Sequence, residues 1–290
     1  GIVDLEKVSD PMEYRKGLSN RKGPAIFGFS RASSIEKSQL ESVEALTMTY
    51  SATMLGRSVA RLYLSPLSGR ALYDGLIRAS QILLGIDAVG QISPFSLVHL
   101  VTSTADFQKF WVKGSEIDQM EASSIAHERE KLLPPDPLDE LECVKSTLIL
   151  MEWMEEAKMG DLERRWGVQP GDLRSRVEAA EWLLRASIRI LSDSEHESLS
   201  DLTVAPPLLE ILKETRTRLQ HGCKPDIIPL VGIRGVGRSR ARDLVNRLSV
   251  ESVRDVASMT NNDLEKLGGL QGWSTKLASN IRKEASRIVK

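Results

Sequence analysis

"GDLRSRVEAAEWLLRASIRIL", residues 171–191, has the residue spacing of one amphipathic α-helix. Each residue of an α-helix turns the side-chain direction by about 100°. On that wheel a set of apolar residues falls within about 60° of Leu173, which is the spacing of a helix face buried in a core. This set is Val177, Ala180, Leu184, Ile188 and Leu191. The stretch therefore predicts a long helix with a core-facing stripe.

Trp182 lies on the polar side of this predicted helix, about 180° from Leu173. Arg185 and Arg189 are its neighbours there, and Arg174 lies about 80° away. Two interpretations follow. Either a second helix covers the ring, because bundle helices are often buried on two sides, or the ring stacks on a nucleobase while the arginines neutralise phosphates. The helix alone leaves both open.

A second informative stretch is "DIIPLVGIRGVGRSRARDLV", residues 226–245, in which two apolar helical segments flank a glycine-rich turn. Glycine permits positive φ and close backbone approach, and N–H groups at the start of the next helix can hold an anion. A weaker copy follows at residues 264–281, "LEKLGGLQGWSTKLASNI". We predict a phosphate site in the first copy, although such hairpins also serve protein contacts alone. Its residues are Gly235, Val236, Gly237, Arg238, Arg240 and Arg242.

The composition is that of a globular protein, with 41% apolar and 27% charged residues among 290. No apolar run reaches the roughly 18 residues that span a membrane, and the start has no signal-peptide layout. Two cysteines, Cys143 and Cys223, make no disulfide framework, although one bond between them stays open. Histidines and cysteines do not pair at metal-ligand spacing. We expect a cytoplasmic protein without a membrane partner or a metal site.

The net charge of −1 is unevenly distributed. Residues 224–290 hold 13 Lys and Arg and 7 Asp and Glu, a net charge of +6, so the first 223 residues carry −7. A basic terminal domain predicts a polyanion partner at that end of the chain. The alternative is chance surface composition, because this excess is only moderate.

The pattern along the chain predicts three domains, at residues 1–68, 69–223 and 224–290. "ALTMTYSATMLG", residues 45–56, has the alternation of a strand, and a short helix is expected at 56–64. From residue 70 to about 222 the pattern is helical, with a long polar helix expected at 107–131 and a last one at 199–220. The predicted fold class is mainly α: a helical bundle followed by helical hairpins, after a small N-terminal α+β segment.

Several segments together resemble the C-terminal half of superfamily two DNA helicases of the superkiller type, and most of all the archaeal members that act on stalled replication forks. The segments are "ATMLGRSVARLYLSPLSG" at 52–69, "VKSTLILMEWMEE" at 144–156, "GDLRSRVEAAEWLLRA" at 171–186 and "LVGIRGVGRSRARDLV" at 230–245. The hairpins by themselves resemble the helix-hairpin-helix fold of DNA-binding proteins.

This resemblance implies a winged helix, a bundle with a DNA-contacting "ratchet" helix, and a helix-hairpin-helix domain. Trp182 matches the family's base-stacking tryptophan, whereas Ser175 stands where the family has a DNA-contacting arginine. The expected partner is single-stranded or forked DNA, together with helicase motor domains. The expected role is strand gripping in an ATP-dependent helicase of fork repair, associated with the nucleoid.

No catalytic site is expected in this chain, because it has no Gly-x-x-x-x-Gly-Lys-Ser/Thr loop for ATP phosphates. "DELE", residues 139–142, resembles a helicase metal-binding box in letters only. ATP and Mg²⁺ are therefore expected only in motor domains outside the chain, and no small-molecule substrate is expected. The chain is then a piece of a longer helicase, which a start at Gly1 favours, or a relative without a motor. A protein-interaction scaffold and an RNA-binding module remain the alternatives.

Overall fold

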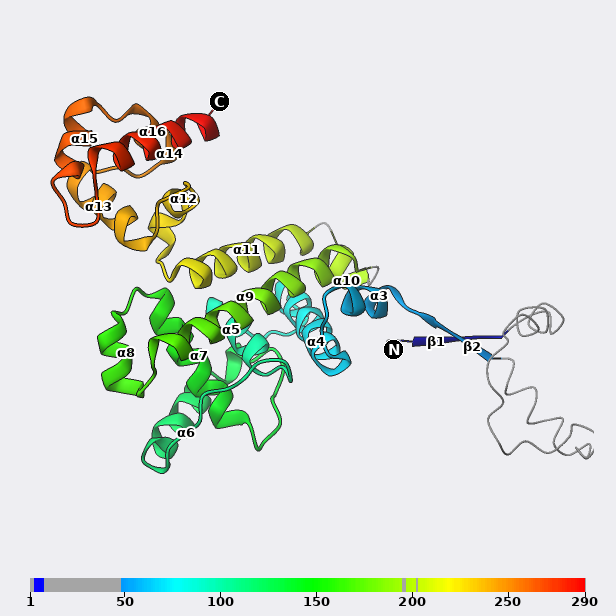
Figure 1. Cartoon of the computed structure of the whole chain (residues 1–290). Helices are drawn as coiled ribbons and strands as arrows, with labels where there is room; N and C mark the ends of the chain where they lie inside the picture. The colour runs from blue at the N-terminus through cyan, green and yellow to red at the C-terminus, as the bar shows by residue number, and fades with distance from the viewer. Residues whose placement is uncertain (1–2, 8–47, 195–196, 202, 290) are drawn as a thin grey trace, which may run out of the picture. The chain divides into compact units, whose positions relative to one another are not determined.

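The computed structural model describes residues 3–7, 48–194, 197–201 and 203–289, and most of these residues are α-helical (Figure 1). The predicted mainly α fold class is thus confirmed. The chain divides into two compact units, Gly1–Pro66 and Leu67–Lys290. Both cysteines are buried and free, so the bond left open between them is absent.

The first unit contains a two-stranded sheet and one helix. Strand β1 (Val3–Lys7) pairs antiparallel with β2 (Met48–Ala52), and α3 (Met54–Arg61) follows directly. The helix begins at Thr53, whose side-chain oxygen accepts the N–H of Gly56 at 3.0 Å. This confirms the predicted strand followed by a helix. The remainder of the predicted winged-helix-like segment, residues 8–47, lies outside the described residues.

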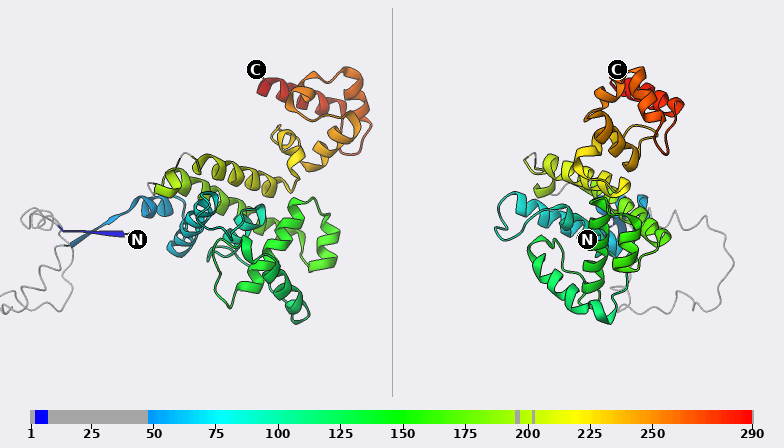
Figure 2. Two further views of the ribbon diagram at one scale, coloured as in Figure 1. Left: turned by 180° about the vertical axis from the view of Figure 1, so that it is seen from behind. Right: turned by 90° about the vertical axis from the view of Figure 1, so that its left-hand side faces the viewer.

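The second unit starts with a helical bundle. Its central helix is α5, which is buried from Phe95 to Thr102 and packs against α7 and α9. In both views α9 and α11 run alongside each other (Figures 1 and 2). The helices of the bundle are α4 (Pro66–Leu83), α5 (Pro94–Thr102), α6 (Ile117–Ala126), α7 (Glu140–Met154), α8 (Met159–Trp166), α9 (Pro170–Ser192), α10 (Glu197–Ser200) and α11 (Ala205–His221).

The long polar helix predicted for residues 107–131 is wrong. The chain is irregular from residue 103 to 113, and α6 covers only the middle of that range. Part of the backbone there bonds to side chains of α7: Phe110 N–H donates to Ser146 Oγ at 2.8 Å, and Lys145 Nζ donates to the Trp111 carbonyl at 2.8 Å. These contacts hold the segment in a non-helical conformation.

The single helix predicted for residues 199–220 is also wrong, because the chain breaks between α10 and α11. Within the break the Asp201 carboxylate accepts the N–H of Thr203 at 2.7 Å, a local bond that competes with helix formation. The end of α11 at His221 lies one residue from the predicted end, and Gly222 caps it in a left-handed conformation with φ of 58°. A Cβ at Gly222 would also collide with the Trp153 ring.

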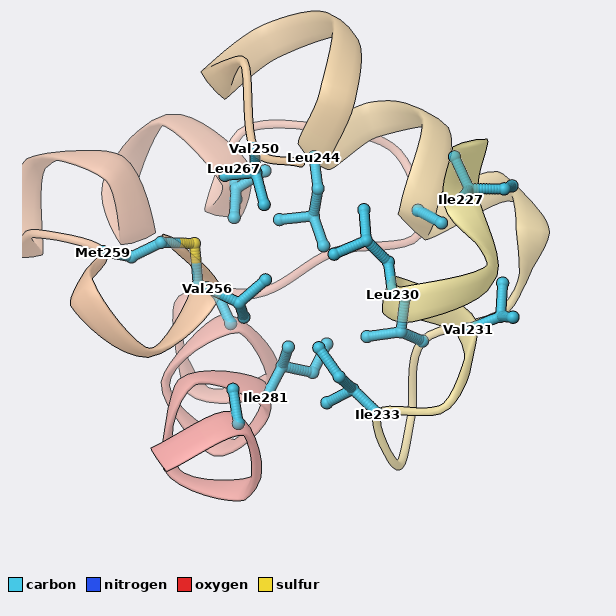
Figure 3. Packing of buried hydrophobic residues seen from close by; sticks show 14 of the residues in the cluster. Ile227, Leu230, Val231, Ile233, Leu244, Val250, Val256, Met259, Leu267 and Ile281 are labelled. Atoms are coloured by element: carbon cyan, nitrogen blue, oxygen red, sulfur yellow. The ribbon is translucent and has the colours of Figure 1, made fainter. Parts of the chain in front are cut away.

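The C-terminal part of the second unit is built from short helices around its own core (Figure 3). Leu230, Leu244, Val256 and Ile281 point into this core from four different helices, and Ile233 does so from the turn after α12. The helices are α12 (Ile228–Val231), α13 (Arg238–Leu248), α14 (Val253–Ser258), α15 (Asn261–Gly268) and α16 (Thr275–Val289).

The doubling of the hairpin predicted from sequence is confirmed in the backbone. In the first turn, Ile233 N–H donates to Leu230 O and Val236 N–H donates to Ile233 O. The second turn repeats both bonds with Leu267, Leu270 and Trp273 in the matching places. The glycine before the last donor has positive φ in each turn, 90° at Gly235 and 82° at Gly272. The two turns therefore share one geometry.

Candidate nucleic-acid interface

Helix α9 is buried on more than the predicted stripe. Of that stripe only Ile188 is half-buried and the other positions are buried. A second set on the neighbouring face is buried as well: Leu183, Ala186 and Ile190. Trp182 lies at the edge of this second face and is half-buried. Its ring thus has both a covered part and an open part.

The three predicted α9 arginines have different surroundings. Arg174 Nε donates to Glu178 and Arg189 Nε donates to Asp193, each at 2.8 Å and one helical turn away. The Arg185 side chain is exposed and forms no hydrogen bond or ion pair with any described residue. Arg185 is therefore the one of the three whose guanidinium is free for a ligand.

A cavity of about 760 Å³ runs beside α9 and is called the α9 cavity here. Leu173 and Val177 form part of its apolar lining, and Arg185 lies at the same face of the helix. Across the cavity Arg216 of α11 binds Glu181 of α9 at 2.6 Å. The remaining lining residues are Trp153, Met159, Pro170, Arg174, Glu178 and Gln220.

The two hairpins meet in a second cavity of about 390 Å³, the hairpin cavity, which Gly237 lines from the first hairpin and Gly272 from the second. Arg240 joins the hairpins, because it donates to the Gly235 carbonyl at 2.9 Å and to the Gly272 carbonyl at 3.2 Å. The side chain of Trp153 from α7 also lines this cavity. Trp153 therefore contributes to both cavities.

The first turn of α13 has no side-chain cap, and the phosphate site predicted there stays a prediction. Gly237 stands at the N-cap and has no side chain to accept the N–H groups of that turn. The second hairpin differs, because Ser274 Oγ accepts the N–H of Leu277 at 3.1 Å at the start of α16. Only the first hairpin thus presents an uncapped helix start, and such a start favours phosphate.

Arg238 is half-buried against the bundle. Its guanidinium lies 4.3 Å from the centre of the Trp153 ring, and Nη1 donates to the Gly222 carbonyl at 3.0 Å. Trp153 is itself fixed by a bond from Nε1 to the Leu219 carbonyl at 2.8 Å. Burial lowers the pKa of Arg238. Arg238 therefore connects the hairpin to α7 and α11.

Arg242 is bound by two carboxylates. It donates to both oxygens of Glu156, at 2.6 and 2.7 Å, and to both oxygens of Asp226, at 2.5 and 2.8 Å. These hydrogen bonds raise the pKa of Arg242. Burial alone would raise the pKa of Glu156, but the bonds from Arg242 and from the Lys224 N–H outweigh it and hold that pKa below its ordinary value. The Arg242 bonds also lower the pKa of Asp226.

Sequence reasoning missed three residues of this region: Trp153, Arg234 and Lys283. Trp153 stands in a segment whose pattern indicated only a core helix, and its partners lie far along the chain. Arg234 precedes Gly235 directly, so its position beside the turn could have indicated it. Lys283 lies on α16 and is brought to the first hairpin only by the fold.

Two structural findings concern other classes of site. Among the described residues, no helix has the length and apolar character that a membrane crossing needs. Nor do three or more His, Cys, Asp or Glu side chains gather as metal ligands in the described ranges. The expectation that ATP and Mg²⁺ belong to motor domains outside this chain stays a prediction.

Comparison with known proteins gives the class. Residues 95–222 match the family model described as archaeal helicase, domain 4. The chain is thus related to archaeal superfamily two helicases and corresponds to a C-terminal region of them.

The particular relatives are ATP-dependent DNA helicases named Hel308. The protein from Pyrococcus horikoshii is 26% identical over 239 residues, which cover 81% of this chain and 30% of the relative. The protein from Aeropyrum pernix is 30% identical over 227 residues, which cover 78% of this chain and 28% of the relative. The protein from Methanocaldococcus jannaschii is 28% identical over 237 residues, which cover 80% of this chain and 17% of the relative. The chain therefore spans less than a third of the length of these relatives.

Proposed function

We propose that this chain grips single-stranded DNA as part of an ATP-dependent DNA helicase that acts on replication forks. The observation that carries the proposal lies on α9. The half-buried Trp182 and the unpaired, exposed Arg185 are three residues apart, so they are neighbours on one helix surface. A half-open aromatic ring beside a free guanidinium suits one stacked base and its phosphate.

The hairpins support the same proposal. In it, the uncapped first turn of α13 at Gly237 holds a backbone phosphate, and Gly235, Val236 and Arg240 shape the turn that presents those N–H groups. Trp153 lines both the α9 cavity and the hairpin cavity, so in this proposal the strand passes from α9 to the hairpin beside Trp153.

The wider role rests on the relatives, whose printed name is ATP-dependent DNA helicase. Under this proposal the motor domains, with ATP and Mg²⁺, lie outside the chain. Residues 1–68 would form a winged-helix-like segment, and residues 224–290 a helix-hairpin-helix domain. The protein would work inside the cell at the nucleoid.

The test is fluorescence anisotropy with a labelled single-stranded DNA. We expect Trp182→Ala to weaken binding by about 1–3 kcal/mol, the usual contribution of one stacked base. Arg185→Ala, at an exposed position, should lower the salt dependence of binding by about 0.7 in log–log slope, the value for one phosphate contact on a single strand. A circular dichroism spectrum shows whether each variant is folded.

Trp111→Ala is the matched control, because Trp111 is 77% exposed and lines neither cavity. Its affinity should equal that of the wild type. Folded variants of Trp182 and Arg185 with unchanged affinity would contradict the α9 site. Wild-type protein that binds no DNA at low salt would favour a protein-interaction scaffold, and preference for single-stranded RNA over DNA would favour an RNA-binding module.

A further inference from the structure

A third cavity is lined by the start of the first hairpin turn and by α16, and it is called the α16 cavity here. It has a volume of about 510 Å³ and combines residues from two places in the chain. Arg234 and Gly235 come from the turn after α12. Asn280, Lys283, Glu284 and Arg287 come from α16, where spacings of three and four residues place them on one helix face.

The cations of this cavity are less engaged than those predicted from sequence. Arg234 and Lys283 are exposed, and within the described ranges neither forms a hydrogen bond or an ion pair. Arg287 binds Glu284 at 2.6 Å and is also exposed. The cavity thus holds three cations and one carboxylate, and the two cations that the carboxylate does not bind make its surface positive.

Arg238, Arg240 and Arg242 show the contrast. The guanidinium of Arg238 contacts the Trp153 ring and a carbonyl. That of Arg240 binds two hairpin carbonyls, and that of Arg242 binds two carboxylates. A phosphate at any of them would compete with a contact of the folded chain. At Arg234 and Lys283 a phosphate would displace only water.

The position of the cavity relates it to the hairpin. Gly235 lines the α16 cavity, whereas Gly237, two residues later, lines the hairpin cavity. The backbone of Gly235 has φ of 90°, which keeps this position free of a side chain. A nucleic-acid backbone that crosses the turn would therefore pass from one cavity to the other.

We infer that the α16 cavity binds a second backbone phosphate, adjacent to the one held at the start of α13, through Arg234 and Lys283. This inference rests on the proposed function, since it assumes that the hairpin binds nucleic acid. It assigns the main charge contact of the hairpins to Arg234 and Lys283 instead of to Arg238, Arg240 and Arg242.

The test compares two double variants of equal charge change. Arg234→Ala with Lys283→Ala removes the free cations of the cavity. Arg247→Ala with Arg254→Ala removes two exposed arginines that line none of the three cavities and have no partner in the described part of the chain. Each protein is titrated with a labelled single-stranded oligonucleotide at several salt concentrations.

We expect the cavity variant to bind about tenfold more weakly at low salt and to lose about 0.7 in log–log salt slope, the value for one phosphate contact on a single strand. The control variant should retain nearly the wild-type slope. Equal losses in both variants, or no loss in the cavity variant, would overturn the inference while leaving the proposed function standing. A wild-type chain that binds no oligonucleotide would overturn both.

Discussion

The guanidinium of Arg242 is shared by two carboxylates, and this sharing changes what a substitution at the site would measure. Glu156 takes a left-handed backbone conformation, φ 68°, which is uncommon outside glycine. Its carboxylate nevertheless accepts two bonds from Arg242 and one from the Lys224 N–H. A residue predicted as a phosphate ligand therefore also connects the end of α7 to α13.

Glu156→Gln tests this connection without changing the size of the side chain. The pKa of Glu156 in the folded protein lies below its ordinary value of 4.5. Its contribution to stability is therefore complete above that value and is lost as the pH falls through the lower, folded pKa. We expect the variant to lose about 1.5–3 kcal/mol at neutral pH, the range for hydrogen bonds to a charged group, and its stability to depend less on pH below 4.5.

Urea denaturation at pH 7 and at acid pH measures both effects. Glu214→Gln is the control, because Glu214 is exposed and has no ion pair with a described residue. Equal acid sensitivity of the Glu156 variant and the wild type would show that the pair contributes little to stability.

At the scale of elements, prediction succeeded where the signal is local. The end of α11 lies within one residue of the predicted end, because the cap formed by Gly222 depends only on adjacent residues. The segment before α6 was mispredicted because its conformation is set by Lys145, more than thirty residues later. The α9 wheel gave the core stripe, but the burial of Leu183 depends on helices that no single-helix pattern contains.

Lys145 provides the element-scale prediction. Its side chain is only 3% exposed, and Nζ binds Glu116 at 2.7 Å as well as the Trp111 carbonyl. Lys145→Ala leaves the Glu116 carboxylate, 13% exposed, without its cation. We expect a loss of about 3–5 kcal/mol in unfolding free energy, the range for removing one partner of a buried pair.

The double variant Lys145→Met with Glu116→Gln separates charge from packing. Replacement of both partners removes the stranded charge, so it should recover a large part of the loss. Urea denaturation measures all three proteins. An unfolding free energy of Lys145→Ala within about 0.5 kcal/mol of the wild-type value would mean that α7 does not fix the segment before α6. Substitutions at surface positions usually fall in that range.

At the scale of the whole molecule, the charges are distributed so that residues 224–290 carry +6 and the remainder −7. The structure changes what the positive sum means, because Arg238, Arg240 and Arg242 are engaged within the fold. Among the described residues that line the three cavities, unpaired and exposed cations lie at two places, Arg185 at the α9 cavity and the pair Arg234 and Lys283 at the α16 cavity. Charge count alone therefore overstates how many phosphates the chain can hold.

When one DNA strand contacts both places, the losses in binding caused by the substitutions depend on the length of that strand. Arg185 shares no partner with Arg234 or Lys283, so the free-energy losses of Arg185→Ala and of the double variant should add. They add only for a strand long enough to reach both places. Together the three substitutions should lower the log–log salt slope by about 1.4 on a long single strand, and the Arg185 effect should disappear on a strand that occupies only the hairpin.

Anisotropy titrations over a series of oligonucleotide lengths measure this threshold, with the Arg247→Ala and Arg254→Ala protein as the charge control. Losses that fail to add at any length would mean that α9 and the α16 cavity bind separate strands. Losses that add even on the shortest strand bound would mean that the substitutions act on the field of the whole protein instead of on single phosphates. Addition above one threshold length is the result that a single continuous strand across both places requires.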